Sequence, residues 1–334
     1  MKILVAMLKD HKTETFMTPE NQEKLASLGE VTWIESKGPK ITPEELRDAL
    51  EDMDVCVCTW GIPKFEGIVL EKANKLKLIA YTAGSVHNIV SDEMYEKGIR
   101  IVCGNEGFAE SVAEGAMTYM LANLRRLKDY DLCNKNIVWR PDPWYSERLL
   151  DKTVGIVGYG SIARHLLRML KPFHVKVKLY SKHTTEEQAA EMGVQKATLE
   201  EIFATCDIVS IHSARSAANY HLVTADMLNS MREGALLVNT ARGDIIDQEA
   251  LIPLLQSGKI RASLDVYEGP EPLAMDSPFR SMPSNALCFP HMGGPTEDYR
   301  YYCALLTFQD IERMQKGEPL QNEIKPWRAA MMTK

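Results

Sequence analysis

Residues 153–163, TVGIVGYGSIA, decide the fold of this chain. The apolar residues Val154, Ile156 and Val157 form the near-continuous run that is typical of a strand buried on both faces of a parallel sheet. After the glycines, apolar residues recur at helical spacing until Pro172 ends the pattern: Ile162, Leu166, Leu167 and Leu170. The stretch therefore predicts a strand, a tight turn and a helix.

The glycines of this turn suit a bound dinucleotide. Gly158 permits the tight turn, Gly160 lets a backbone approach a pyrophosphate, and the small Ala163 lets the helix pack on the strand. The backbone N–H groups of Ser161 and Ile162 would face the phosphates at the positive end of the helix. Glycines also end many strands for local reasons, but the flanking strand and helix favour a dinucleotide site over a purely structural turn.

Length and charge exclude several classes of protein. A chain of 334 residues with 45% hydrophobic residues predicts about two domains, each with its own core. A net charge of -7 argues against a nucleic-acid partner or an anionic membrane surface. The apolar start of the chain is too short for a secretory signal and indicates a first strand, and we find no run long enough to span a membrane. We therefore expect a cytoplasmic protein.

The cysteines indicate reduced thiols rather than a metal site. The chain has seven, and four of them lie within apolar runs: Cys56, Cys58, Cys206 and Cys288. Cys56 and Cys58 lack the two-residue gap of a zinc knuckle, and strand alternation would place both on one face as small core residues. No metal ion is expected.

Before the glycine turn, apolar runs alternate with helical patterns, at residues 2–8, 31–34, 55–59, 76–81 and 99–102. Thr42 is a plausible N-cap, followed by Pro43 at the first helical position and by Glu45, which completes a capping box. Ser91 opens another helix, which stops at Gly98. This alternation predicts a small parallel α/β domain.

A long helix is predicted at residues 111–128, with a broad apolar stripe formed by Val112, Met117, Met120, Leu121, Leu124 and Leu127. The simplest interpretation is a linker helix between domains. The stripe is wider than one neighbour needs, so a subunit interface is a further possibility.

A second series of strands and helices predicts a six-stranded doubly wound sheet, with strands near residues 153–157, 175–180, 207–211, 235–239, 262–266 and 287–289. A last helix at residues 296–315 leaves too few residues for a third domain, so we expect it to pack on the first. The predicted domains are residues 1–104 with 296–334, and residues 105–295.

Three loops follow strands of this second series, at the edge where a doubly wound sheet binds ligands. Arg242 could hold a carboxylate with two parallel hydrogen bonds, or pair with Asp244 or Asp247 at the surface. Residues 265–272 offer three carboxylates. His291 could donate a proton near neutral pH, or be an ordinary buried histidine.

Together with the glycine turn, these loops resemble the D-2-hydroxyacid dehydrogenase family over nearly the whole chain. The matching pieces are SVAE at 111–114, KTVGIVGYG at 152–160, NTARG at 239–243, LDVY at 264–267 and PHMGG at 290–294. The resemblance implies a Rossmann domain beside a smaller flavodoxin-like α/β substrate domain. It implies catalytic roles for Arg242, Glu271 and His291, with Glu268 as the other candidate glutamate.

The resemblance further implies reduction of a small 2-oxo acid to a D-2-hydroxy acid by a nicotinamide cofactor, in a homodimer. Arg242 and the loop of Ala83, Gly84 and Ser85 would bind the substrate carboxylate, although residues 83–88 depart from the family's usual turn. Asp265 would bond the nicotinamide carboxamide. The cofactor residues expected in this way are Gly158, Gly160, Ser161, Ile162, Ser181, Lys182, His212, Thr240, Ala241, Asp265 and Gly293.

The turn after residues 175–180, the second strand of the second series, favours NADP over NAD. An NAD site needs an acidic residue there for the ribose hydroxyls, but the chain has Ser181 and Lys182, and no carboxylate occurs between Asp151 and Glu186. A lysine and a hydroxyl would attract a 2′-phosphate, so we expect NADPH, with NADH possible.

Other functions remain open on this scaffold. The runner-up among enzymes is a formate- or phosphonate-type dehydrogenase. A nucleotide-sensing corepressor or an assembly protein with a vestigial site are the alternatives without catalysis, and an intact arginine, glutamate and histidine set argues against both.

Overall fold

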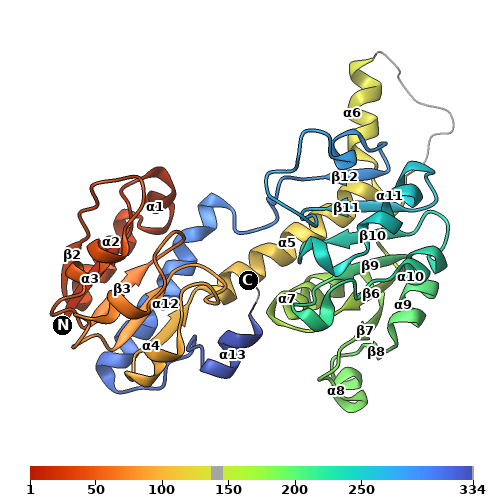
Figure 1. Cartoon of the computed structure of the whole chain (residues 1–334). Coiled ribbons are helices and arrows are strands. Elements are labelled where there is room, and N and C mark those ends of the chain that lie inside the picture. The colour runs from red at the N-terminus through yellow and green to blue at the C-terminus, as the bar shows by residue number, and fades with distance from the viewer. Residues whose placement is uncertain (137–145, 333–334) are drawn as a thin grey trace. The chain divides into compact units, whose positions relative to one another are not determined.

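A computed structural model describes residues 1–136 and 146–332 of the protein. The chain divides into two compact units, one of Met1–Phe108 with Pro295–Lys334 and one of Ala109–Gly294. Each unit is built on a single parallel sheet with helices against it (Figure 1).

The first unit has a five-stranded sheet in the order β2-β1-β3-β4-β5. The strands are β1 Lys2–Ala6, β2 Glu30–Trp33, β3 Val55–Cys58, β4 Leu78–Tyr81 and β5 Arg100–Cys103. Alternate residues of β3 enter different core clusters, so Cys56 and Cys58 face one side while Val55 and Val57 face the other. The predicted strands and the shared face of the two cysteines are confirmed.

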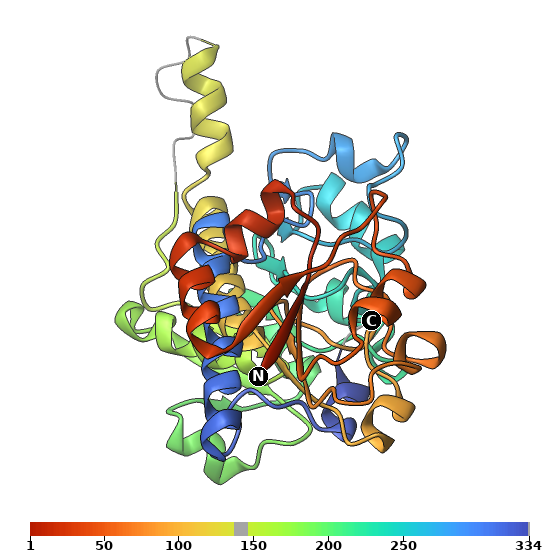
Figure 2. The same cartoon turned by 90° about the vertical axis from the view of Figure 1, so that its left-hand side faces the viewer.

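The helices of this unit are α1 His11–Phe16, α2 Pro19–Leu28, α3 Pro43–Ala49, α4 Asp92–Glu96, α12 Arg300–Lys316 and α13 Pro326–Met331. The predicted caps are present, because Thr42 and Glu45 form a reciprocal capping box and Ser91 accepts the N–H of Met94. Helix α12 begins at Arg300, later than predicted, because a short 3₁₀ turn occupies Glu297–Tyr299. It contacts α1 and α2 from the far end of the sequence (Figure 2).

The C-terminal segment joins the edge of the same sheet. Glu323 pairs in antiparallel fashion with Val102 of β5, and its carboxylate bonds the guanidinium of Arg100 at 2.8 Å. The buried carboxylate of Asp310 accepts the backbone N–H groups of Gln321 and Asn322 at 2.8 and 2.9 Å. Residues distant in sequence therefore complete the first unit.

The second unit has a seven-stranded sheet in the order β12-β11-β10-β9-β6-β7-β8, in which every pair is parallel. The strands are β6 Thr153–Val157, β7 Lys176–Tyr180, β8 Gln195–Lys196, β9 Ile208–Ile211, β10 Leu236–Asn239, β11 Arg261–Leu264 and β12 Ala286–Cys288. The predicted doubly wound fold is confirmed. The prediction of six strands is wrong, because the two-residue β8 carries no apolar run.

The helices of this unit are α6 Leu127–Lys135, α7 Ser161–Leu170, α8 Glu186–Glu191, α9 Leu199–Thr205, α10 Ala225–Ser230 and α11 Gln248–Gln256. Helix α7 forms where the glycine turn predicts it and buries Ala163, Leu166 and Leu170. Helix α5, Asn105–Leu124, enters the unit at Ala109.

The predicted helix at 111–128 has different bounds. Helix α5 begins six residues earlier and ends at Leu124, because Arg126 adopts a left-handed conformation with φ of 51° before α6 starts. Met117, Met120 and Leu124 are buried in the core of the second unit, so packing within this unit explains most of the apolar stripe. Leu127 lies on α6 instead, where its exposed fraction is 58%.

Candidate active site

The turn between β6 and α7 has room for a pyrophosphate. Gly158 has φ of +97°, and a Cβ atom on it would lie 2.7 to 2.8 Å from the backbone of His212 and Ser213. A Cβ on Gly160 would meet nothing within 4 Å, and no side chain caps the N-terminus of α7. The backbone N–H groups of Ser161 and Ile162, in the first turn of α7, therefore lie next to an open space lined by Gly158 and Gly160. This glycine cradle fits the phosphates of a dinucleotide.

Two polar atoms at neighbouring strand ends are buried without a partner among the described residues. His212 follows β9, its Nε2 lies 2.8 Å from Oγ of Ser210, and its Nδ1 has no hydrogen bond. Burial lowers the pKa of His212 to about 4, so the ring is neutral at neutral pH. Oγ1 of Thr240, after β10, is likewise unpaired. A ligand at this edge of the sheet could satisfy both atoms.

The turn after β7 is shaped by hydroxyl groups. Oγ of Ser181 accepts the hydroxyl of Thr184 at 2.9 Å and the N–H of His183 at 3.4 Å, and Ser181 is buried. Lys182 is exposed. The turn thus presents a fixed hydroxyl beside a cation.

Arg242 lies in the loop after β10, which its neighbours hold tightly. Asn239 bonds both sides of the turn, accepting the N–H of Ala241 at 3.0 Å and donating to the carbonyl of Arg242 at 2.9 Å. A Cβ on Gly243 would lie 1.8 Å from the carbonyl carbon of Tyr267, so this loop packs directly on the loop after β11.

The guanidinium of Arg242 is partly buried and lies near other charged groups. Burial lowers the pKa of its guanidinium, nearby Arg215 acts in the same direction, and Glu271 opposes them. The two aspartates that could have paired with Arg242 have other partners: Asp244 bonds Arg215 at 2.6 Å, and Asp247 caps α11.

His291 and Glu271 form a pair in the second unit. Nδ1 of His291 lies 2.8 and 3.0 Å from the two carboxylate oxygens of Glu271, and both side chains are nearly half exposed. Glu268, the other candidate, instead bonds Nε2 of His221 at 3.0 Å and the hydroxyl of Tyr220 at 2.9 Å. The geometry therefore brings Glu271, and not Glu268, to His291.

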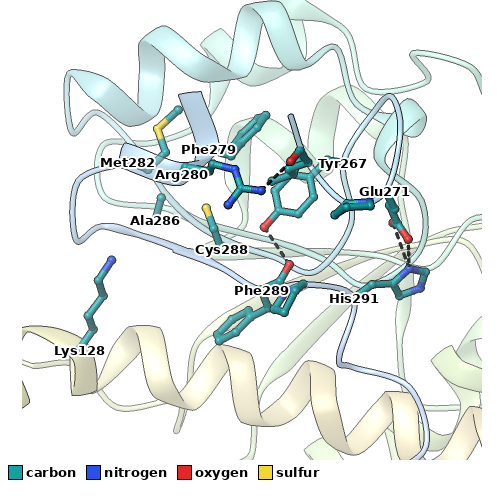
Figure 3. A pocket seen from close by; sticks show the side chains of 13 residues that line it. Lys128, Tyr267, Glu271, Phe279, Arg280, Met282, Ala286, Cys288, Phe289 and His291 are labelled. Carbon is teal, nitrogen blue, oxygen red and sulfur yellow. Dashed lines mark hydrogen bonds and ion pairs between the residues drawn. The ribbon is translucent and has the colours of Figure 1, made fainter. Parts of the chain in front are cut away.

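Glu271 and His291 lie at one end of a cavity of about 500 Å³ (Figure 3). Its wall is mostly apolar and includes Tyr267, Leu273, Phe279, Met282, Ala286, Cys288 and Phe289. Water can therefore reach Glu271 and His291 from this cavity.

The carboxylate of Asp265 accepts three hydrogen bonds, two of them from the loop of residues 289–293 that carries His291, which we call the histidine loop. Its exposed fraction is 2%, and its Oδ1 accepts the N–H of Met292 at 2.7 Å and the hydroxyl of Tyr119 at 3.0 Å. Oδ2 accepts the N–H of Gly293 at 2.8 Å. The expected bond from Asp265 to the cofactor carboxamide stays a prediction, while the bonds present hold the histidine loop. Tyr119 was missed, and its signal is a lone tyrosine in an apolar helix four residues after Gly115.

Ala83, Gly84 and Ser85 follow β4 in the first unit, whereas Arg242, Glu271 and His291 belong to the second. Ala83 is completely buried, and its carbonyl accepts the N–H of Gly104 at 3.0 Å. The substrate role of these three residues stays a prediction.

Two further findings concern ligands and membranes. Over residues 1–136 and 146–332, no three histidine, cysteine, aspartate or glutamate side chains are grouped so that they could hold a metal ion. Among the helices of this described part, none combines the length and apolarity needed to cross a membrane.

Residues 117–293, which include the glycine turn, Arg242, Glu271 and His291, match the D-isomer specific 2-hydroxyacid dehydrogenase, NAD binding domain. The chain belongs to the D-isomer specific 2-hydroxyacid dehydrogenase family. The resemblance seen in the sequence is thus confirmed, and the second unit contains the family's NAD-binding domain.

Relatives within this family carry different names. A glyoxylate reductase of Thermococcus litoralis is 31% identical over 291 residues, which cover 84% of this chain and 87% of that protein. The human glyoxylate reductase/hydroxypyruvate reductase is 32% identical over 75% of this chain and 77% of its own length. The chain spans only 58% of a D-3-phosphoglycerate dehydrogenase of Methanocaldococcus jannaschii, at 31% identity over 92% of this chain.

Solved structures share this fold. The D-lactate dehydrogenase of Escherichia coli superimposes with a TM-score of 0.73 at 26% identity, over 97% of this chain and 100% of that one. A phosphoglycerate oxidoreductase from Rhizobium etli gives a TM-score of 0.80 at 24% identity, over 97% and 99% of the two chains.

Proposed function

We propose that this D-2-hydroxyacid dehydrogenase family member reduces a small 2-oxo acid to its D-2-hydroxy acid with a nicotinamide cofactor, and that NADPH is the preferred donor. The pairing of His291 with Glu271 carries the proposal, because a histidine oriented by a carboxylate is suited to proton transfer. Both residues belong to the unit that contains the glycine cradle.

The two partners of the reaction are a hydride and a proton. The nicotinamide, when bound, supplies the hydride to the carbonyl carbon of the substrate. His291, protonated, donates the proton from Nε2 to the oxygen that becomes the hydroxyl group. Glu271 at Nδ1 keeps the imidazole oriented, with Nε2 left to face the substrate.

Arg242 would bind the carboxylate of the 2-oxo acid. Its guanidinium is partly desolvated, and this strengthens a charge-assisted bidentate bond. Its Nη1 donates to the carbonyl of Ala241 at 2.7 Å, which helps to hold the guanidinium in the loop after β10. Positioning of this kind supplies much of the rate of such reactions. We expect the backbone near Gly84 and Ser85 to assist.

The preference for NADPH rests on the turn after β7. Ser181 and Thr184 are fixed by a mutual hydrogen bond, Lys182 is exposed beside them, and no acidic residue lies between Asp151 and Glu186. An acid there would repel a 2′-phosphate, whereas a lysine attracts it.

A panel of 2-oxo acids tests this proposal. Purified protein is mixed with glyoxylate, hydroxypyruvate, pyruvate or phenylpyruvate and with either reduced cofactor, and the loss of nicotinamide absorbance is followed. We expect turnover of at least one acid with NADPH. Binding of both reduced cofactors without turnover of any acid would contradict the proposal.

A further inference from the structure

One face of α5 follows β11 and the loop after it. Gly115, Tyr119 and Asn123 are spaced four residues apart, so they lie one above the other on the helix. A Cβ on Gly115 would lie 3.0 Å from the carbonyl oxygen of Gly293, and Nδ2 of Asn123 donates to the carbonyl of Ala262 at 3.0 Å. This face therefore touches both the strand and the histidine loop.

Tyr119 is the residue of this face that reaches the histidine loop with a side chain. Its ring stacks on Phe289, with centroids 4.2 Å apart and planes 7° apart, and its exposed fraction is 8%. Its hydroxyl donates to Oδ1 of Asp265 at 3.0 Å. Phe289 lies two residues before His291, so Tyr119 contacts the loop at its start and supports it through Asp265 at its end.

The carboxylate of Asp265 needs these donors. A buried charge is costly unless hydrogen bonds replace its water, and Asp265 receives one from Tyr119, one from Met292 and one from Gly293. Burial and the charge of Asp265 raise the pKa of the Tyr119 phenol, so the hydroxyl remains a donor at neutral pH. Both backbone donors are the residues directly after His291.

We infer that Tyr119 is a positioning residue for catalysis: its hydroxyl fixes Asp265, and Asp265 fixes His291 through the N–H groups of Met292 and Gly293. The inference rests on the proposed function only for its kinetic consequence. The carbonyl of Asp265 adds to the same anchor, because it accepts the N–H of His291 at 2.9 Å.

The variant Tyr119→Phe keeps the ring stacked on Phe289 and removes only the hydroxyl. We expect kcat for 2-oxo acid reduction to fall about 10-fold, as loss of one hydrogen bond to a charged group predicts. We expect KM to change less than about 2-fold, because Arg242 is untouched. The control is Asn123→Ala, which removes the hydrogen bonds that Nδ2 of Asn123 donates to Ala262, Ser263 and Asn285 but leaves Asp265 intact. It should lower the melting temperature and leave kcat unchanged.

Hydrogen exchange of the cofactor-free protein, read at single amides, tests the same inference without activity. In Tyr119→Phe, the amides of Met292 and Gly293 should exchange faster, while that of Phe289, which bonds the carbonyl of Leu264 at 2.8 Å, should not. Unchanged exchange at Met292 and Gly293 would overturn the inference. So would a loss of activity that appears in KM alone, or an equal loss of kcat in Asn123→Ala.

The exchange result also separates two failures. A wild-type protein that turns over no 2-oxo acid would contradict the proposed function. Its Met292 and Gly293 amides would still report whether the Tyr119 hydroxyl holds the loop.

Discussion

Nδ1 of His291 lies 2.8 Å from Oε2 of Glu271, although the two residues are separated by 20 positions in the sequence. The nearby Glu268 forms an independent pair with His221. These two histidine–glutamate pairs lie in the same unit, and the pair of His221 and Glu268 provides matched controls for the pair of His291 and Glu271.

The variant Glu271→Gln should lower kcat for reduction by about 10-fold. An uncharged amide makes a weaker hydrogen bond to Nδ1 of His291 than a carboxylate does, so the ring is less firmly oriented toward the substrate. Steady-state kinetics with the best acid of the panel measure this loss. Glu268→Gln is the control, because Glu268 bonds His221, and it should leave kcat unchanged. A loss of kcat in Glu268→Gln with none in Glu271→Gln would transfer the role to Glu268.

His291→Ala should abolish reduction while cofactor binding survives. The proton donor is lost, whereas the glycine cradle at Gly158 and Gly160 is unchanged. Steady-state turnover and a fluorescence titration with reduced cofactor measure the two properties separately. His221→Ala removes the histidine that pairs with Glu268 and should retain activity. Substantial turnover by His291→Ala would exclude the assigned role.

Arg242→Lys should raise KM and lower kcat/KM. The loss of transition-state stabilisation should be about 2 to 4 kcal/mol, as expected when a charged bidentate contact is lost. Kinetics with the best acid of the panel provide the measurement. Arg232→Lys, which changes an arginine paired with Asp207 at 3.5 Å, serves as the control. Near-normal kcat/KM in Arg242→Lys would show that another group binds the carboxylate.

Ser181→Asp should weaken the binding of NADPH and raise kcat/KM for NADH relative to that for NADPH. The new acid would accept hydrogen bonds from the ribose hydroxyls and repel a 2′-phosphate. The ratio of kcat/KM for the two cofactors is the readout, and Ser230→Asp on the exposed surface of α10 is the control. The interpretation of this turn fails if the unmodified protein uses NADH at least as well as NADPH.

A homodimer remains the predicted assembly, with part of its contact supplied by residues 111–128. The structure leaves Leu127 exposed there, and Leu132 on the same helix is 44% exposed. Helix α6 stands out from its unit in both views (Figures 1 and 2). Sedimentation velocity at micromolar protein should show a dimer that Leu127→Glu with Leu132→Glu weakens. A monomeric wild type would contradict the prediction.

Most elements of the fold could be predicted from short stretches of sequence. The capping box of Thr42 and Glu45 and the glycine turn at Gly158 are contained in a few consecutive residues, so the sequence was enough to place them. Strand β8 could not be predicted in this way, because its two residues pair with β7 without a buried apolar run.

The active site was predictable only in part. Family motifs indicate Arg242 and His291, but the choice between Glu271 and Glu268 depends on how the loop after β11 folds. The bond between Tyr119 and Asp265 joins residues 146 positions apart. Helix periodicity alone marks Tyr119 as part of an apolar stripe and gives no indication of its partner.

The first unit combines residues 1–108 with residues 295–334, and this arrangement affects the order in which the two units can fold during synthesis. Strands β1 to β5 leave the ribosome first, yet the core beneath them needs Ala304, Phe308 and Ile311 of α12, and the edge of β5 needs Glu323. The residues of the second unit, in contrast, emerge as one uninterrupted segment. The nascent chain can therefore finish its later unit first, while one apolar face of its earlier sheet waits for α12 and is the surface that a chaperone would need to shield.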